Sequence, residues 1–299
     1  MACGRAIPCE TARDAVLAYR RGRLVCPADA GMPLLMGILN VTPDSFSDGG
    51  RHDGDPRAAA EDALALLEEG AALVDIGGES TRPGATPVPA AEEIRRVVPV
   101  VAELRRLHGG AVISVDTSKA SVARAALDAG ADIVNDVSAM GDPGMAAVLA
   151  EYGAACILMH HGAPFVEAPP PPSATPSAAV ASWLSRRLAE AREATGLPLE
   201  NFAVDPGVGF GKSLRENLSL MANAGRALMP LGVPLVMAFS RKSCIGAATG
   251  VPDASQRLPG TLAGAVLLRR RCHLLRVHDV AATRQALQMA AALEEAAEE

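Results

Sequence analysis

The chain has 299 residues, of which 49% are hydrophobic and 3% aromatic, so it can form one large domain with a core mainly of alanine, leucine and valine. Its net charge of −6 argues against a nucleic-acid-binding protein, a class that is normally basic. It has no apolar run long enough to cross a bilayer, no signal-peptide core at its start and no C-x-x-C pair among its six cysteines. These features favour a cytoplasmic enzyme without a zinc knuckle or disulfide framework.

Residues 1–33 precede the first buried strand and form a short N-terminal extension without a clear motif. Within it, residues 11–22 have the composition of a short helix and residues 24–26 that of a strand. We expect this extension to cover the closed end of the domain that follows, which spans residues 34–299.

From residue 34 onward, short apolar runs alternate with longer segments that have apolar residues at helical spacing. The strands are expected at residues 34–39, 73–76, 112–116, 133–135, 155–159, 202–205, 235–239 and 274–277. The helices are expected at residues 56–69, 91–107, 118–129, 144–151, 177–195, 214–228, 261–271 and 280–297.

Eight alternating strand–helix units in about 265 residues match the size of a (β/α)₈ TIM barrel of parallel strands with right-handed crossovers. A doubly wound open sheet is the alternative, but it usually has fewer strands and a single switch point. The proline-rich residues 163–176 indicate a long, stiff loop after the fifth strand.

Polar residues follow each of the eight expected strands, and in a closed barrel they would form a ring around one mouth. They are Asn40, Asp75 to Glu79, Asp116, Asn135 with Asp136, His160 with His161, Asp205, Ser240 to Ser243, and Arg276 to Asp279. Because barrel active sites lie at the carboxyl ends of the strands, this ring predicts a functional site.

The ring divides into two chemical sets. Asp116, Asn135, Asp205 and Lys242 combine acceptors, an amide and one cation, which suits a flat heterocycle with N–H donors beside a carbonyl. The second set suits an anionic group.

Arg276, His278 and Asn40, with a divalent ion, suit a phosphate or diphosphate. Ser243 opens an expected short helix, where backbone N–H groups can hold a carboxylate.

Three other features are less specific. The run Gly207–Ser213 resembles a phosphate loop, but Pro206 stands where a Walker A motif needs glycine. The adjacent pair His160-His161 is expected to have one packed and one solvated ring rather than to bind a metal, because neighbours on an extended chain point apart. The chain uses arginine almost throughout, and its three lysines are Lys119, Lys212 and Lys242. We expect the first two to mark helix starts and Lys242 to be functional.

Seven segments of the chain together resemble dihydropteroate synthase, a family of pterin-binding (β/α)₈ barrels. They are MGILNVTPDSFSDGG (36–50), DIGGESTRPGA (75–85), VDTSKASV (115–122), NDVSA (135–139), DPGVGFGKS (205–213), SRKS-x-IG (240–246) and RVHDV (276–280). The resemblance implies a homodimeric transferase of folate biosynthesis, a target of sulfonamides. Such an enzyme joins p-aminobenzoate to 6-hydroxymethyl-7,8-dihydropterin diphosphate and releases 7,8-dihydropteroate and diphosphate.

Carried over position by position, the resemblance implies three groups of site residues. The pterin would be held by Asp116, Asn135, Asp205 and Lys242, and the diphosphate by Asn40, Arg276 and His278, with Mg²⁺ on Asn40. The p-aminobenzoate pocket would be formed by Phe46, Thr81, Arg82, Pro83, Lys242 and Ser243. The catalytic residues would be Asp116, Lys242, Arg276, His278, Asp44 and Arg82.

The implied reaction needs no covalent enzyme intermediate. Mg²⁺, Arg276 and His278 would stabilise the departing diphosphate, and Asp116 would favour positive charge on the dihydropterin methylene. The arylamine is neutral at physiological pH, so no strong general base is required.

The sequence departs from the family pattern at three places. The fifth-strand segment Met159–Pro164 is one residue shorter and lacks a second methionine. Cys244 stands where phenylalanine is expected, and the N-terminal extension has no counterpart among the motifs.

Three alternatives to the synthase remain. A methyltransferase that uses methyltetrahydrofolate would need the pterin residues but not the diphosphate set. A catalytically silent pterin-binding paralogue would bind pterin without turnover. A structural barrel with an unrelated substrate would leave the polar ring as coincidence.

Overall fold

The computed structural model describes residues 14–27, 32–41, 55–80, 86–162 and 175–297. Its central sheet has eight parallel strands in the order β8-β7-β6-β5-β4-β3-β10-β9. An isolated parallel bridge between Val204 and Leu235 brings the two outer strands together and nearly closes the barrel. The expected TIM barrel is confirmed, and the open doubly wound sheet is excluded.

The strands lie close to their expected positions because each is a short apolar run buried on both faces. They are β3 (Leu34–Asn40), β4 (Leu73–Gly77), β5 (Ile113–Asp116), β6 (Ile133–Asp136), β7 (Ala155–Met159), β8 (Phe202–Asp205), β9 (Val236–Met237) and β10 (Leu274–Val277). Of the expected strand 235–239, only the two residues of β9 are paired in the regular ladder.

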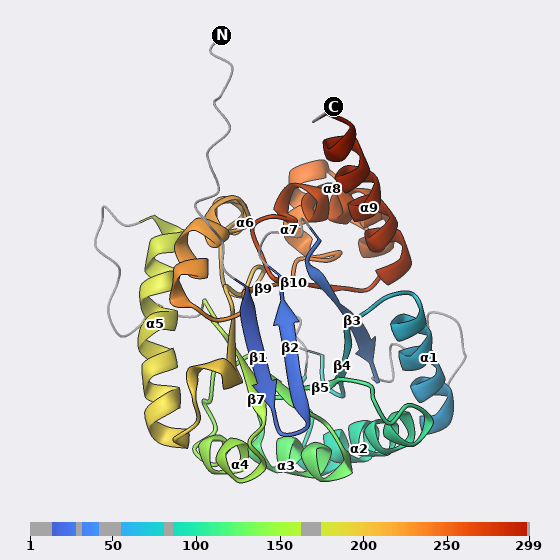
Figure 1. The fold of residues 1–299 in the computed structure, drawn as a ribbon, viewed down its shortest axis with the longest axis vertical. Helices are drawn as coiled ribbons and strands as arrows, with labels where there is room; N and C mark the ends of the chain where they lie inside the picture. Colours follow the sequence, from blue (N-terminus) through green and yellow to red (C-terminus); the bar gives the residue numbers. More distant parts are fainter. Residues whose placement is uncertain (1–13, 28–31, 42–54, 81–85, 163–174, 298–299) are drawn as a thin grey trace.

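Helices surround the strands, as Figure 1 shows. They are α1 (Pro56–Glu68), α2 (Ala90–Leu107), α3 (Ala120–Ala129), α4 (Met145–Tyr152), α5 (Pro176–Thr195), α6 (Leu214–Leu228), α7 (Ser243–Thr249), α8 (Leu258–Leu268) and α9 (Val280–Ala297). The short helix expected at Ser243 is confirmed as α7. Within the described ranges, no helix is both long and apolar enough to cross a membrane.

Two helix boundaries differ from expectation. Helix α3 begins at Ala120 rather than residue 118. The reason is that the Ala120 N–H donates to Asp142 from the next loop at 2.9 Å. Thr117, the expected cap, accepts from Lys119 N at 3.2 Å, before the helix begins. Helix α8 begins three residues early, at Leu258, with Pro259 in its first turn, a position where the missing proline N–H costs nothing.

The N-terminal extension contains a hairpin of β1 (Ala15–Tyr19) and β2 (Gly22–Cys26). The helix expected over residues 11–22 is therefore wrong for residues 15–19, whereas the strand expected at 24–26 is confirmed. In the structure, buried Ala15 and Leu17 alternate with more exposed neighbours, which is the two-residue period of a strand packed on one face. Ala15, Leu17 and Cys26 pack into the barrel interior with residues such as Met36 and Ile133.

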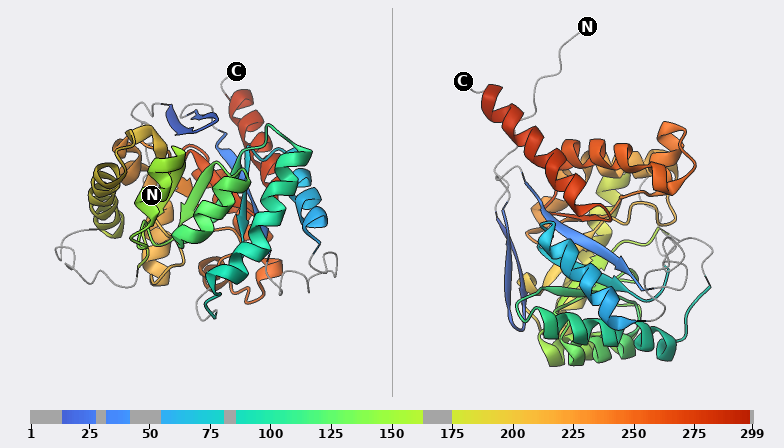
Figure 2. Two further views of the ribbon diagram at one scale, coloured as in Figure 1. Left: turned by 90° about the horizontal axis from the view of Figure 1, so that it is seen from below. Right: turned by 90° about the vertical axis from the view of Figure 1, so that its right-hand side faces the viewer.

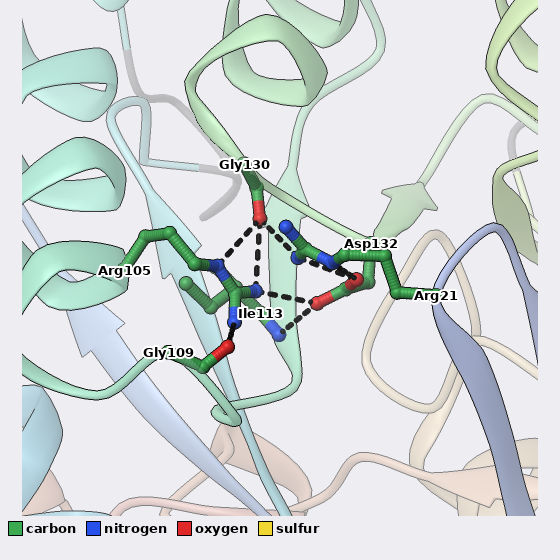
Figure 3. Close-up of polar contacts among 6 residues, drawn as sticks. All are labelled: Arg21, Arg105, Gly109, Ile113, Gly130 and Asp132. Atoms are coloured by element: carbon green, nitrogen blue, oxygen red, sulfur yellow. Dashed lines mark hydrogen bonds and ion pairs between the residues drawn. The ribbon is translucent and has the colours of Figure 1, made fainter.

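The hairpin lies across the end of the barrel at which the strands begin (Figure 2). Arg21 in its turn donates to Asp132 Oδ1 through Nε at 2.8 Å and Nη2 at 2.6 Å (Figure 3). Asp132 Oδ2 accepts from Arg105 of α2 at 2.9 Å and from Ile113 N at 3.0 Å. Both arginines also donate to the Gly130 carbonyl. The hairpin, the described part of the extension, thus covers the closed end of the barrel, as expected.

Candidate functional site

The strand register places four of the ring positions at one level. Asn40 pairs with Gly77, Gly77 with Asp116, and Asp116 with Asn135 across β3 to β6. Gly77 has no side chain, and a Cβ there would approach Asp116 Cβ to 3.4 Å and Asn40 Oδ1 to 3.9 Å. Because position 77 is glycine, no side chain of its own lies between this amide and this carboxylate at the mouth.

Asp75 of β4 is the centre of the polar network inside the mouth. Its fully buried carboxylate accepts from Ser114 Oγ at 2.6 Å, Asn135 Nδ2 at 3.0 Å and Arg276 Nε at 2.6 Å. A buried carboxylate is stable only with such partners. Asp75 therefore fixes the orientation of both Asn135 and Arg276.

Arg276 of β10 joins the two sides of the site. While its Nε is bonded to Asp75, its Nη2 donates to Asp116 Oδ2 at 2.8 Å. The site residues expected to hold the heterocycle and the diphosphate are thus connected by one guanidinium group. Its neighbours Asp75 and Asp116 raise the pKa of Arg276 against the effect of burial, so it stays charged.

Asp116 is incompletely satisfied. Its Oδ1 is buried and has no hydrogen-bond partner among the described residues. Burial raises the pKa of Asp116 from 3.8 to about 7, Arg276 opposes this, and Asp75 adds to it. A buried acceptor without a donor is suited to an N–H group of a ligand.

Asp205 and Lys242 form the opposite side of the mouth. Asp205 Oδ1 accepts from Gly207 N at 2.6 Å, and burial raises the pKa of Asp205. Lys242 Nζ donates to the Val208 carbonyl at 2.5 Å and lies 4.6 Å from the centroid of the Phe210 ring. Burial lowers the pKa of Lys242 to about 8, with Asp205 acting against it.

The segment that presents Lys242 is held in a strained conformation. Arg241 has φ of 57°, a left-handed value uncommon outside glycine. Its backbone N–H donates to Thr261 Oγ1 at 3.0 Å, and its Nε donates to Asp279 at 2.9 Å. These contacts fix the turn that carries Lys242 from β9 to α7, with Ser243 exposed at the first position of the helix.

His278 lies beside the network rather than in it. Its Nδ1 is 3.0 Å from Ser240 Oγ, which also accepts from His278 N at 3.3 Å. This contact links the exits of the neighbouring strands β10 and β9 and fixes the imidazole at the mouth. His278 therefore sits one residue beyond the strand that carries Arg276.

The histidine pair is arranged as expected. His160 is buried, with its ring edge-on to Trp183 of α5 at 5.0 Å between centroids, whereas His161 is exposed. The described residues contain no group of three or more His, Cys, Asp or Glu side chains that could hold a metal ion.

The expectation that Lys119 and Lys212 only mark helix starts is wrong. Lys119 Nζ forms ion pairs with Glu79 and with the buried Glu93, at 2.6 Å for Glu93 Oε2. Glu79 in turn accepts from Val88 N at 2.8 Å, so this cluster joins the two ends of the segment after β4. Lys212 donates to three backbone carbonyls.

Five expected site residues lie outside the described part of the chain, so their placement stays a prediction. They are Asp44, Phe46, Thr81, Arg82 and Pro83. The proline-rich residues 163–174 also lie outside it, and the effect of the shortened segment after Met159 stays untested.

Sequence reasoning placed Asp75 in the polar ring but gave it no role in the site, and it missed Ser114. The available signal was an acidic residue inside the apolar run Leu73-Val74-Asp75-Ile76. A carboxylate buried in a strand must face a cation or donors, and this alone points to a partner across the barrel.

Comparisons with known proteins agree with this geometry. Residues 36–278 match the model of the family described as pterin binding enzymes. The dihydropteroate synthase of Escherichia coli K12 is 41% identical over 263 residues, which cover 87% of this chain and 92% of that protein. A probable bifunctional folylpolyglutamate synthase/dihydropteroate synthase of Halobacterium salinarum is also 41% identical, over 91% of this chain, but this chain spans only 33% of its length.

Solved structures are similar over nearly the whole chain. A dihydropteroate synthase of Xanthomonas albilineans with 4-aminobenzoic acid has a TM-score of 0.83 and 44% identity, and the match covers 94% of this chain and 98% of that one. The Yersinia pestis dihydropteroate synthase in a sulfonamide drug complex has a TM-score of 0.80 and 36% identity, covering 94% and 99%.

Proposed function

The chain belongs to the pterin-binding enzymes, among the dihydropteroate synthases, which are transferases of folate biosynthesis, and we propose how its own residues perform that reaction. It joins p-aminobenzoate to the methylene carbon of 6-hydroxymethyl-7,8-dihydropterin diphosphate and releases 7,8-dihydropteroate and diphosphate. The observation that carries this proposal is Arg276, whose guanidinium group spans Asp75 and Asp116.

The pterin is bound by Asp116, Asn135, Asp205 and Lys242. The Oδ1 of Asp116, which no described residue bonds, supports this role, because it can accept a hydrogen bond from an N–H of the ring. Asp205 lies on the other side of the mouth, with Lys242 as its neighbouring cation. The ring is thus held between two buried carboxylates, and N–H donors of a ligand would offset part of the cost that burial places on their ionised forms.

The diphosphate is held by Arg276, His278 and Asn40. Arg276 is positioned by Asp75. A guanidinium has five N–H groups, so those not bonded to Asp75 and Asp116 can donate to an anion. As the C–O bond breaks, negative charge grows on the diphosphate, and fixed cations stabilise that charge more in the transition state than in the ground state.

Asn40 fits a Mg²⁺ ion that is bound mainly through the substrate. Magnesium commonly uses one or two protein oxygens together with phosphate oxygens and water, and Asn40 offers one amide oxygen beside Gly77, which has no side chain. When bound there, the ion supplies charge neutralisation of the diphosphate.

The p-aminobenzoate side uses Lys242 and Ser243 together with Phe46, Thr81, Arg82 and Pro83. The exposed start of α7 at Ser243 supports this assignment, because it places a hydroxyl and a lysine at the edge of the pterin site. Asp44 and Arg82 complete the proposed catalytic set. The amine nitrogen bonds the methylene carbon as or after its C–O bond to diphosphate breaks and then gives one proton to solvent, so no covalent enzyme intermediate forms.

The test is release of diphosphate by the purified protein with both substrates and Mg²⁺, with dihydropteroate identified by mass. We expect release to require p-aminobenzoate and to be lost in Lys242→Ala and Arg276→Ala. Pterin binding without any product would contradict the synthase and favour the silent paralogue. Methyl transfer from methyltetrahydrofolate would favour the methyltransferase instead.

The proposed assembly is a homodimer through the outer face of α8. This helix, LPGTLAGAVLL, has no charged residue, and Leu267 on it is 71% exposed. Leu293 and Met289 on the neighbouring α9 are also exposed. Together with Leu267 they form an exposed apolar patch, and such patches commonly mark protein–protein interfaces. Sedimentation should show a dimer for the wild type and a monomer for Leu267→Glu, whereas a monomeric wild type would contradict it.

We also place the protein in the cytoplasm. The cysteines of the described part, Cys26, Cys156, Cys244 and Cys272, are all buried free thiols, as expected in a reducing compartment. Cell fractionation tests this placement, and recovery outside the cytoplasmic fraction would contradict it.

A further inference from the structure

The ammonium group of Lys212 donates hydrogen bonds to residues that follow two neighbouring strands, β7 and β8. Its Nζ donates to the carbonyls of Gly207 at 2.7 Å, His160 at 3.0 Å and Phe210 at 3.2 Å. His160 directly follows β7, and the other two belong to the loop at 206–212 that follows β8. Because an ammonium group has three N–H donors, these contacts use its full capacity.

The backbone around Lys212 is packed too closely for side chains. A Cβ on Gly207 would lie 1.9 Å from the His160 carbonyl oxygen, and one on Gly162 would lie 2.4 Å from that of Phe210. Gly207 also has φ of 68°, in the left-handed region. The three carbonyl oxygens that accept from Lys212 converge on one point, where their partial negative charges repel one another, so a cation between them stabilises the arrangement.

The same loop forms the support for two proposed pterin-binding residues. The Val208 carbonyl accepts from Lys242 Nζ at 2.5 Å, and the Phe210 ring lies 4.6 Å from that ammonium group. Gly207 N donates to Asp205 Oδ1 at 2.6 Å. A shift of the loop would therefore move the partners of both Lys242 and Asp205.

We propose that Lys212 is a positioning residue that holds the 206–212 loop in the arrangement in which it supports Lys242 and Asp205. Lys212 does not itself touch substrate, since its donors point at backbone carbonyls. Burial lowers the pKa of Lys212 to about 8 while Asp205 acts in the opposite direction, so the ammonium form prevails at neutral pH. The kinetic part of this inference rests on the proposed synthase function.

The test uses Lys212→Met, Lys212→Arg and the control Arg215→Met, which removes an exposed cation three residues away. We expect kcat/KM to fall about 10- to 100-fold in Lys212→Met, because small displacements of binding groups have effects of this size. In Lys212→Arg, kcat/KM should fall about 10-fold, since a planar guanidinium cannot direct its donors to three carbonyls around one point. Arg215→Met should match the wild type.

The pH profile separates positioning from stability. Asp205, Arg276, Asp116 and Cys244 act on Lys242, whose pKa of about 8 should set the alkaline limb of kcat/KM. In Lys212→Met, loss of the Val208 and Phe210 contacts that stabilise the charged form of Lys242 should move that limb to lower pH, whereas loss of the Lys212 charge alone would move it to higher pH. A variant with a lower melting temperature but wild-type kcat/KM and an unmoved limb would overturn the proposal.

A second readout does not need turnover. Trp183 is the only tryptophan, and it packs on His160, whose pKa is lowered to about 4 by burial and then by Lys212. Protonated His160 quenches Trp183 fluorescence, so the pH midpoint of this quenching should rise in Lys212→Met, which loses the cation that lowers the pKa of His160. The midpoint should be unchanged in Lys212→Arg, which keeps the charge. An unmoved transition in Lys212→Met would contradict the placement of Lys212 beside His160.

The two readouts separate the two proposals. A wild type that makes no dihydropteroate would reject the synthase function. The fluorescence shift would still test whether Lys212 holds the His160 end of the 206–212 loop contacts. If Lys212→Met does not fold, Lys212→Arg decides, and wild-type kinetics in that variant would overturn the positioning role.

Discussion

Each end of the barrel carries a buried carboxylate that faces arginine, but the two carboxylates are satisfied to different degrees. Asp132 at the closed end accepts four hydrogen bonds, two from Arg21, one from Arg105 and one from Ile113 N (Figure 3). Asp116 at the open end accepts from Arg276 on Oδ2, while its buried Oδ1 lacks a hydrogen-bond partner among the described residues.

This difference separates a stabilising ion pair from a binding site. At the closed end, the protein supplies the donors that a buried carboxylate needs, so the cluster can fasten the hairpin to the barrel. At the open end, one acceptor is left for a ligand, and the cost of burying it appears as the raised pKa of Asp116. Changes at the two ends should therefore affect different measurements.

The largest expected effect is on catalysis at the open end. Arg276→Met removes the cation shared by Asp75 and Asp116 and the proposed diphosphate ligand, and we expect kcat/KM to fall about 100- to 1000-fold. Diphosphate release measures this, with exposed Arg226→Met as the control. Activity within tenfold of the wild type would show that Arg276 does not hold the diphosphate.

The next largest effect is on stability at the closed end. Asp132→Asn removes the charge that both Arg21 and Arg105 face, so the free energy of unfolding should fall by about 3 kcal/mol. Urea unfolding measures this, and kcat/KM should stay within about twofold because the change is far from the mouth. The exposed Asp128→Asn should have little effect. A large loss of activity in folded Asp132→Asn would contradict the division between the ends.

A smaller effect concerns pH at the open end. Asp116 must be ionised to accept a pterin N–H, so affinity for a pterin should rise by up to about tenfold per pH unit below about pH 7 and level off above it. The same raised pKa has the opposite effect on stability. Its contribution is fully present below the unfolded pKa of about 4 and is lost as the pH rises through about 7.

Calorimetry with a non-reactive pterin between about pH 5.5 and 8 checks this dependence, with Asp116→Asn as the comparison. The variant should bind weakly and lose this part of the pH dependence. A wild-type affinity that is independent of pH in this range would show that Asp116 is already ionised.

The smallest expected effect comes from one half of the closed-end cluster. Arg21→Met leaves Asp132 bonded to Arg105 and Ile113 N, and the Arg21 side chain is 38% exposed, so solvent already screens its charge. We expect a loss of about 1 kcal/mol in the free energy of unfolding. A loss as large as that of Asp132→Asn would mean that the hairpin depends on Arg21 alone.

Several features could be predicted from the sequence because they depend on local periodicity. The eight buried strands and the helices between them follow from short apolar runs that alternate with helical spacing, and their order implies a parallel barrel. The position of Asp116, Asn135, Asp205, Lys242 and Arg276 directly at or after strand ends placed them at one mouth. Their partners were not predictable in this way.

The hairpin and Asp75 show what the sequence did not reveal. Residues 15–19 have too few positions to distinguish a strand from a helix by pattern, and burial against the barrel interior decides for the strand. The ion pair of Asp75 with Arg276 joins residues 201 positions apart, and the three carbonyls that hold Lys212 come from two loops.

The sequence by itself determined the barrel and the identity of the polar side chains at its mouth, because strand order and strand ends are encoded locally. Only the tertiary structure decided which of these side chains satisfy one another and which keep an atom available for a ligand. The reason is that burial and neighbouring charge, which set the hydrogen bonds and pKa of Asp116, arise from strands distant in the chain.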